Sequence, residues 1–384
     1  MIHREISDKK FQMDSLDGLR GFAALIVVFS HTSNVGMFFI PFLDLRGIGK
    51  SGVFLFFLLS SFLLTLPLLK KGREVLSFPV MSNYWQRRFF RIYPLYTIYL
   101  LLAAASTLVI FLLFGKSGIG IPFALDFYGF LNHLALQEGK GVTWSIAVEF
   151  KFYFILPIFI FGIVFVRNYG NGALLLLFFV LLILSQLVLP QSESTTNDAR
   201  LLSYMPIFII GIFLAVLQDY INTRKNKPQY VTLVLSWMGY IGLGGAILMT
   251  PLVFSMFGDK VPNNFFHKQF ILYAVVWSLV ILSAVNVDGF IKIFFTLKFL
   301  RFYGAVSFSL YLFHVIFISA LTFIGEFYRT ELNGYISAWG VLFGSTVAAY
   351  ISFRLLESPI SKYKLSRSFL KPVAHILRHF TGKK

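Results

Sequence analysis

The sequence predicts an all-α fold, a polytopic membrane helix bundle of about ten transmembrane helices with both termini in the cytoplasm. The chain is 57% hydrophobic and only 13% charged over 384 residues, whereas soluble domains carry about 25% charged residues. Its mean hydropathy is +0.75. Apolar stretches long enough to cross a bilayer alternate with charged or turn-rich breaks, which is the pattern of a multi-pass integral membrane protein.

Ten apolar spans follow one another along the chain. They cover about residues 17–39, 51–69, 93–114, 145–166, 172–189, 202–217, 230–254, 269–287, 303–324 and 335–355. Another apolar segment, at about 124–136, is too short to cross and indicates an interfacial or re-entrant helix. We expect residues 1–15 to form a cytoplasmic segment, 16–359 the transmembrane domain, and 360–384 a basic amphipathic tail on the inner membrane surface.

The distribution of Lys and Arg sets the orientation. Of the 34 such residues, 25 fall in the segments on the side that holds both termini and 8 on the other side, so both termini are predicted to be cytoplasmic. Much of the net charge of +17 then faces the cytoplasm, where anionic lipid headgroups or an anionic cosubstrate could bind. We expect the lipid bilayer as a partner and no nucleic acid.

The absence of cysteine narrows the possible chemistry. With 0 Cys residues the chain has no thiol nucleophile, no disulfide framework and no Cys-ligated metal. Covalent chemistry must therefore use oxygen or nitrogen, and we expect no metal. Residues 1–10 are charged and lack an apolar core with a cleavage site, so no cleavable signal peptide is predicted.

The first span carries the candidate catalytic pair, Arg20 and His31. Eleven residues at about 100° each place both side chains on one helical face, with Asp17 nearly on the same face. His31 lies about 16 Å beyond Arg20 by helix rise, near the middle of a hydrocarbon core about 30 Å thick if Arg20 marks the inner edge. An ionisable side chain at that depth usually faces the bundle interior or a water-filled cavity, so it marks a candidate functional site.

Three arginines within five residues precede the third span. Arg87, Arg88 and Arg91 are flanked by aromatic residues, and residues three or four apart share a helical face. Such a fork of guanidinium groups fits bidentate phosphate binding, and Lys70 and Lys71 add positive charge nearby. The alternative is a positively charged membrane anchor. Three arginines in five residues are more than an anchor needs, so phosphate recognition remains a hypothesis beside it.

A polar stripe enters the fourth span. After Trp144, Ser145, Glu149 and Tyr153 follow one another at four-residue steps and so share a face. Glu149 is the only acidic residue that we place within a span. It is either an interfacial carboxylate paired with Lys151 or water, or a partner of the inward-facing polar residues.

Two further features lie near the C-terminal end. Span nine carries Ser307, Tyr311 and His314 on one face, with His314 near mid-depth. That histidine is either a hydrogen-bonded packing residue or part of the site. Glu357 closes the last span and most simply pairs with Arg354 or another cytoplasmic arginine.

From Leu16 to about Pro359, the chain resembles the acyltransferase-3 family of integral membrane O-acyltransferases. The matching motifs are Arg20 with His31, Gly52 to Leu64, Arg87 to Pro94, Trp144 to Glu149, Ser307 to His314 and the closing Glu357-x-Pro359. Their joint occurrence in the family's order carries the resemblance. Ser61 stands where the family usually has Gly, which raises a question about local helix packing. Some relatives carry a fused hydrolase domain that this sequence lacks, so we expect the stand-alone transmembrane form.

The resemblance implies transfer of an acyl group, most often acetyl, from cytoplasmic acyl-CoA to a hydroxyl of a sugar, surface glycan or secondary metabolite. We expect this to occur in a bacterial inner membrane. Independently, a coenzyme A donor needs a cationic site on the inner face, and O-acyl transfer needs a base, for which His31 is the candidate. Asp17 or Glu149 could orient the ring. His31 could also be a nucleophile that forms an acyl-imidazole.

Two other classes of function remain open from the residues alone. A proton-coupled transporter or glycan exporter could use His31 and Glu149 as a proton relay. The cluster of Arg87, Arg88 and Arg91 partly separates an acyltransferase from a transporter, because a transporter needs no nucleotide-phosphate site. The third class is a noncatalytic membrane sensor of acylated ligands.

Overall fold

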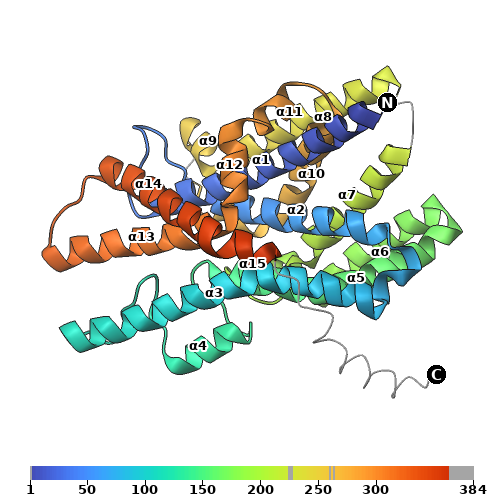
Figure 1. Cartoon of the computed structure of the whole chain (residues 1–384). Helices are drawn as coiled ribbons and strands as arrows, with labels where there is room; N and C mark the ends of the chain where they lie inside the picture. Colours follow the sequence, from blue (N-terminus) through green and yellow to red (C-terminus); the bar gives the residue numbers. More distant parts are fainter. Residues whose placement is uncertain (1, 224–227, 259–260, 263, 363–384) are drawn as a thin grey trace, which may run out of the picture.

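The computed structural model describes residues 2–223, 228–258, 261–262 and 264–362, and in these residues it is a bundle of helices (Figure 1). The predicted fold class, a polytopic helical membrane bundle, is confirmed. Eight of the described helices are long and apolar enough to cross a membrane. They are α2 (Gly49–Leu69), α3 (Phe78–Phe114), α5 (Thr143–Val166), α6 (Asn171–Val188), α7 (Met205–Thr223), α8 (Gln229–Leu248), α13 (Ser307–Tyr328) and α14 (Gly334–Ser352).

Two of the ten expected spans fall outside these eight helices. The first corresponds to α1 (Ile2–Asn34), in which Asp17 and Arg20 lie just before the apolar run. The eighth corresponds to α10 (Phe270–Asn286), an apolar helix of 17 residues, which is about 26 Å long by helix rise. Length and apolarity alone therefore support eight crossings, and the remaining two stay predictions.

The remaining elements are short. They are α4 (Phe127–Leu134), α9 (Pro251–Met256), α11 (Phe290–Phe295), α12 (Lys298–Ala305), α15 (Ser358–Lys362), the 3-10 turns η1 (Gly72–Leu76), η2 (Arg167–Tyr169), η3 (Gln191–Glu193), η4 (Leu202–Tyr204) and η5 (Phe265–Lys268), and the π-helical turn η6 (Phe353–Glu357). At eight residues, α4 is the short helix expected between the third and fourth spans.

Two helices begin well before the expected spans. The first helix starts at Ile2 and the third at Phe78, whereas apolarity alone placed their starts at 17 and 93. A helix does not end where its side chains become polar, so hydropathy marks only the part that lies in lipid. The arginine cluster therefore lies on α3 itself. Most of the expected amphipathic tail, residues 363–384, lies outside the described residues.

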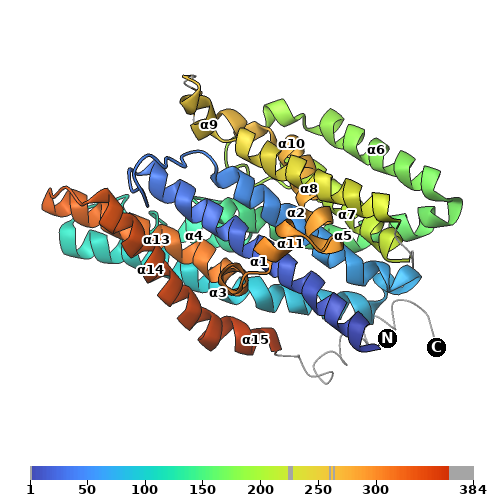
Figure 2. The same ribbon diagram turned by 90° about the horizontal axis from the view of Figure 1, so that it is seen from above.

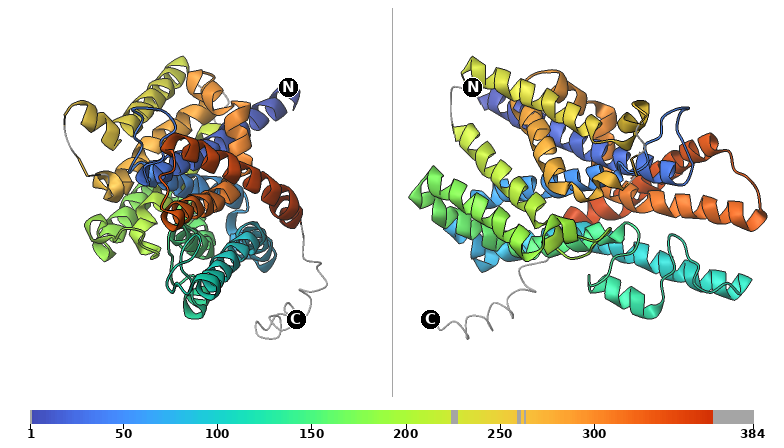
Figure 3. Two further views of the ribbon diagram at one scale, coloured as in Figure 1. Left: turned by 90° about the vertical axis from the view of Figure 1, so that its left-hand side faces the viewer. Right: turned by 180° about the vertical axis from the view of Figure 1, so that it is seen from behind.

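The early helices lie inside the bundle. The end-on view in Figure 3 shows the blue α1 and α2 near the middle, with green, orange and red helices around them. Seen from above, α6 lies at one edge of the bundle and α14 at the opposite edge (Figure 2). The start of α1, the end of α2 and the start of α3 lie at the same end of the bundle, on the right in Figure 1. That arrangement agrees with the expected alternation of helix directions.

Backbone-to-backbone contact holds α1 against α12. A Cβ atom added at Gly21 would lie 1.9 Å from the carbonyl oxygen of Leu300, and one at Gly304 would lie 1.9 Å from that of Asp17. Only glycine permits this approach, as at other close helix crossings in membranes. The crossing fixes the segment of α1 that carries Arg20.

Ser61 is accommodated by a glycine on the facing helix. Its hydroxyl donates hydrogen bonds to the carbonyls of Phe57 and Leu58, at 3.2 and 3.0 Å. A Cβ atom at Gly211 of α7 would lie 1.8 Å from the Ser61 oxygen. The missing side chain at Gly211 thus provides the room that the serine needs, and α2 still packs closely against α7.

Candidate active site

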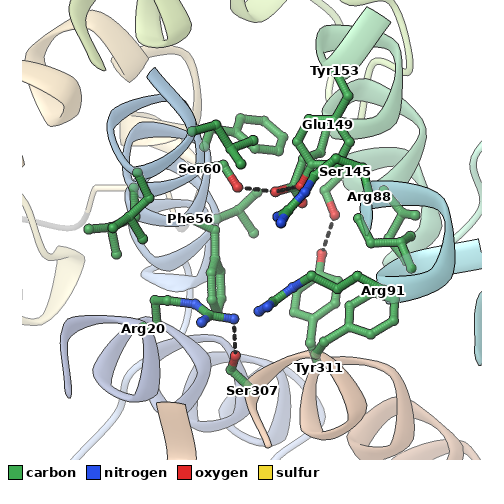
Figure 4. Close-up of a pocket in the computed structure, with 18 of the residues that line it drawn as sticks. Arg20, Phe56, Ser60, Arg88, Arg91, Ser145, Glu149, Tyr153, Ser307 and Tyr311 are labelled. Atoms are coloured by element: carbon green, nitrogen blue, oxygen red, sulfur yellow. Dashed lines mark hydrogen bonds between the residues drawn. The ribbon is translucent and has the colours of Figure 1, made fainter. Parts of the chain in front are cut away.

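A cavity of about 310 Å³ lies among α1, α2, α3, α5 and α13 (Figure 4). Its polar lining comes from motifs far apart in the sequence. The polar lining residues are Asp17, Arg20, Ser60, Arg88, Arg91, Ser145, Glu149, Tyr153, Ser307 and Tyr311. Apolar side chains such as Phe56, Leu63 and Ile92 form the rest of the wall. The structure thus brings residues from five of the six sequence motifs to one site.

Three arginines converge on the cavity. Arg20 and Arg91 point toward each other in Figure 4. Arg20 donates a hydrogen bond to Ser307 at 3.3 Å and lies 3.7 Å from the carboxylate of Asp17. Within the described residues, Arg88 and Arg91 form no ion pair with a carboxylate, and the buried Nε of Arg88 has no hydrogen-bond partner. Such a group of cations is arranged to receive an anion.

The other predicted cations lie outside the cavity. Arg87, Lys70 and Lys71 are exposed and are absent from its lining. Residues 70 and 71 directly follow the last turn of α2, and Arg87 is on α3. The structure therefore divides the expected phosphate site into two cavity arginines and three exposed cations.

Glu149 is held by hydroxyl groups. It accepts hydrogen bonds from Ser60 of α2 and from Tyr153, the latter at 2.6 Å (Figure 4). Lys151 instead donates to the carbonyl of Ala199 at 2.9 Å. Of the two alternatives left open for Glu149, the pairing with Lys151 is therefore wrong. Each residue of a helix is rotated by about 100° from the one before, so Glu149 and Lys151, two residues apart, do not face each other.

Tyr311 separates the cavity from a pair of histidines. Its hydroxyl lies 2.7 Å from the Ser145 oxygen and 3.2 Å from the carbonyl of Val142. Its ring contacts Phe56 on the cavity side, with centroids 6.1 Å apart, and His314 on the other side, at 6.0 Å. Neither His314 nor His31 is a lining residue. Tyr311 is thus the wall between the two parts of the site.

The two predicted histidines contact each other. Nδ1 of His31 lies 2.8 Å from Nε2 of His314, and Nδ1 of His314 lies 3.0 Å from the carbonyl oxygen of Leu310. The ring planes lie at 23° to each other, with centroids 5.1 Å apart. The sequence left Asp17 or Glu149 as the residue that orients His31, and in the structure the partner of its ring is the second histidine. His314 is fully buried.

Trp144 lies outside the cavity and supports its wall. The indole packs against Phe57 and Tyr204, with centroids 5.8 and 5.0 Å away. The ammonium of Lys50, which is buried at the start of α2, lies 3.8 Å from the Trp144 ring centroid. This cation–π contact was not foreseen. The only sign of it in the sequence was the position of Lys50, directly before the apolar span 51–69.

Glu357 has a different partner from the one expected. It accepts a hydrogen bond from Ser309 of α13 and forms no ion pair with Arg354 in the described part of the chain. It lies in the π-helical turn η6, a type of turn that is frequent at functional sites. Sequence reasoning also missed Ser60, because a serine in an apolar helix can instead bond only its own helix, as the hydroxyl of Ser278 does.

A multi-pass helical membrane protein with an arginine-lined cavity beside a histidine pair is the class that this fold and site define. The model of the acyltransferase-3 family, described as an acyltransferase domain, matches residues 13–355. The chain therefore belongs to the acyltransferase-3 family.

Curated relatives are longer than this chain. O-acetyltransferase OatA of Staphylococcus aureus (strain NCTC 8325 / PS 47) is 24% identical over 366 residues, covering 91% of this chain and 57% of the relative. Putative O-acetyltransferase SAS0844 of S. aureus (strain MSSA476) is 24% identical over 376 residues, with the same coverage of 91% and 57%. The chain thus spans less than two thirds of the length of these relatives. Comparison with solved structures gives no match.

Proposed function

We propose that the chain is a membrane O-acyltransferase that moves an acyl group from cytoplasmic acyl-CoA to a hydroxyl of a sugar, surface glycan or secondary metabolite. The observation that carries the proposal is the pair of cavity arginines, Arg88 and Arg91, with no carboxylate partner in the described residues. A planar guanidinium group can donate two parallel hydrogen bonds to the oxygens of one phosphate. The relatives are named as O-acetyltransferases, which supports an acetyl group as the acyl group and a hydroxyl as its acceptor.

The cavity has room for one arm of the donor. Its volume of about 310 Å³ is at the lower end for small-molecule sites, and its walls are largely apolar. We assign the phosphates to Arg88, Arg91 and Arg20 and the pantetheine arm to this cavity, with the acyl end of that arm reaching past Tyr311 to His31, which lies beyond the cavity wall. The exposed cations Lys70, Lys71 and Arg87 extend the positive field beyond the cavity, toward the nucleotide end of the donor.

We assign the proton transfer to His31. It takes the proton of the acceptor hydroxyl as that oxygen attacks the thioester carbonyl. The new C–O bond forms, the C–S bond breaks, and the proton passes to the sulfur of the departing coenzyme A. The step needs no oxidant, reductant or metal. A His31 nucleophile that first forms an acyl-imidazole would use the same ring nitrogen.

The carboxylates of the cavity have supporting roles in this scheme. Asp17 holds Arg20 from 3.7 Å, and Glu149 organises the hydroxyls of Ser60 and Tyr153. These contacts also favour acyl transfer over a proton-coupled transporter. A proton relay would need a hydrogen-bonded connection between His31 and Glu149. In the described residues the His31 ring bonds His314, and the Glu149 carboxylate accepts from Ser60 and Tyr153.

The proposal is tested in inverted membrane vesicles from the host, with and without the gene. Acetyl-CoA labelled in its acetyl group is added to the exposed cytoplasmic face, and alkali-labile label is measured in the glycan and metabolite fractions. We expect gene-dependent label, because O-acetyl esters are cleaved by mild alkali. Equal labelling in both kinds of vesicle, together with no binding of acetyl-CoA to the purified protein, would contradict the proposal.

A further inference from the structure

We propose that His314 is a positioning residue that holds His31 in the tautomer with a proton on Nδ1 and a free lone pair on Nε2. The inference deepens the proposed function and rests on it for its catalytic consequence. It assigns the reacting atom, Nε2 of His31, and gives the buried second histidine a role beyond packing.

A chain of hydrogen bonds fixes the protons. The carbonyl oxygen of Leu310 can only accept, so Nδ1 of His314, 3.0 Å away, must carry a hydrogen. A neutral imidazole has one N–H, which leaves Nε2 of His314 as an acceptor. Nδ1 of His31, 2.8 Å from that atom, must therefore be the donor. Nε2 of His31 is then unprotonated.

The two rival arrangements are each unfavourable. If His314 instead donated from Nε2, its Nδ1 lone pair would face the Leu310 oxygen at 3.0 Å. If His314 carried both protons, a full positive charge would be buried in a side chain with 0% exposure. A buried charge is costly unless it is paired, and in the described residues no carboxylate bonds to either ring.

A neutral partner for His31 also affects the transfer of its proton to the leaving sulfur. A carboxylate on Nδ1 would strongly stabilise the imidazolium that forms when His31 takes a proton, because charge-assisted hydrogen bonds are the stronger ones. His314 supplies orientation without a negative charge. The proton on Nε2 is therefore held less firmly and can pass to the leaving sulfur within the same turnover.

His133 shows the same ring pattern away from the site. Its Nδ1 lies 2.7 Å from the carbonyl of Gly129, and its Nε2 accepts from the backbone N–H of Lys140 at 3.0 Å. The backbone donor makes this assignment unambiguous. Like His314, His133 has 0% exposure. His133→Gln is therefore a matched control for the loss of a buried, helix-anchored histidine.

The first test is spectroscopic. The full chain, labelled with ¹⁵N-histidine, is reconstituted in lipid bilayers, and the His31 signals are identified by their loss in His31→Gln. We expect a protonated Nδ1 and an unprotonated Nε2 in the wild type, lost in His314→Ala and unchanged in His133→Gln. A wild-type His31 with its proton on Nε2 would overturn the proposal.

The second test is kinetic. In His314→Ala we expect label transfer from acetyl-CoA in vesicles to fall about 10- to 100-fold, equal to about 1.4 to 2.7 kcal/mol at 1.36 kcal/mol per tenfold. Acetyl-CoA affinity should stay unchanged. His314→Gln places an amide oxygen near the lost acceptor and should recover part of the rate, whereas His314→Asn, whose amide is one carbon shorter, should not.

The outcomes separate this inference from the proposed function. Wild-type transfer in His314→Ala, with the His31 tautomer unaltered, would make the second histidine a packing residue only. Failure of the proposed function would appear instead as a wild-type protein that neither binds acetyl-CoA nor transfers label. The spectroscopic test still decides the tautomer in that case.

Discussion

The Nε atom of Arg88 is buried beside the cavity without a hydrogen-bond partner. An unpaired buried polar atom costs free energy in the ligand-free protein, and the cost is recovered when an anion binds. Arg91 lies three residues further on α3 and faces Arg20 across the same cavity (Figure 4). At the scale of single residues, this is the feature that most directly indicates a phosphate-bearing ligand.

Replacing Arg88 or Arg91 by Ala should weaken acetyl-CoA binding. A hydrogen bond to a charged group contributes about 1.5 to 3 kcal/mol, so the loss should be about 10- to 150-fold. Lys should restore only part of the affinity, because it lacks the planar fork. Calorimetry on protein in nanodiscs measures these constants.

Arg167→Ala is the matched control for that experiment. This arginine is exposed, pairs with Asp219 at 2.9 Å and lies outside the cavity, so we expect its removal to leave donor affinity unchanged. If Arg88→Ala and Arg91→Ala bind acetyl-CoA as tightly as the wild type, both residues are topological anchors and the donor site lies elsewhere.

The elements hold the site by close crossings and by unusual length. At 37 residues, α3 is about 55 Å long by helix rise, longer than a hydrocarbon core of about 30 Å. It can therefore cross the bilayer and still present Arg88 and Arg91 on an ordered helix. The crossing of α1 by α12 fixes Arg20 from the opposite side of the cavity.

Gly21→Ala should destabilise the fold by separating α1 from α12. The added methyl would lie 1.9 Å from the backbone oxygen of Leu300, and overpacking of this kind costs about 1 to 3 kcal/mol. Gly340→Ala is the control, because a Cβ atom there meets nothing within 4 Å. The fraction of monodisperse protein after heating in detergent measures the effect. Equal heat resistance of the two variants would contradict the close crossing.

For the molecule as a whole, apolarity, charge and spacing predicted the bundle and most of the polar residues that line the cavity. Hydropathy describes one segment at a time, and it placed His31 near mid-depth, Glu149 within a span and Arg20 at the inner edge. It could not pair His31 with a residue 283 positions away, because that contact depends on which helices become neighbours. For the same reason it missed Ser60, whose partner Glu149 lies on another helix.

Both ends of the chain are predicted to face the cytoplasm. The natural sequence has 0 cysteines, so single introduced thiols can be labelled without background. In intact cells, Ile40→Cys in the exposed loop after α1 should react with an impermeant maleimide. Arg73→Cys in η1 should react only after permeabilisation. The reverse pattern would invert the topology and place the arginines on the outer face.

The central claim, that His31 is the base of an acyl transfer from coenzyme A, is tested most directly with His31→Gln. Glutamine keeps a polar side chain but cannot accept a proton near neutral pH. Acetyl-CoA binding and label transfer are measured on the same vesicle preparations. We predict unchanged donor affinity and transfer lower by about two to four orders of magnitude, the usual contribution of a positioned base. Transfer by His31→Gln at the wild-type rate would contradict the account.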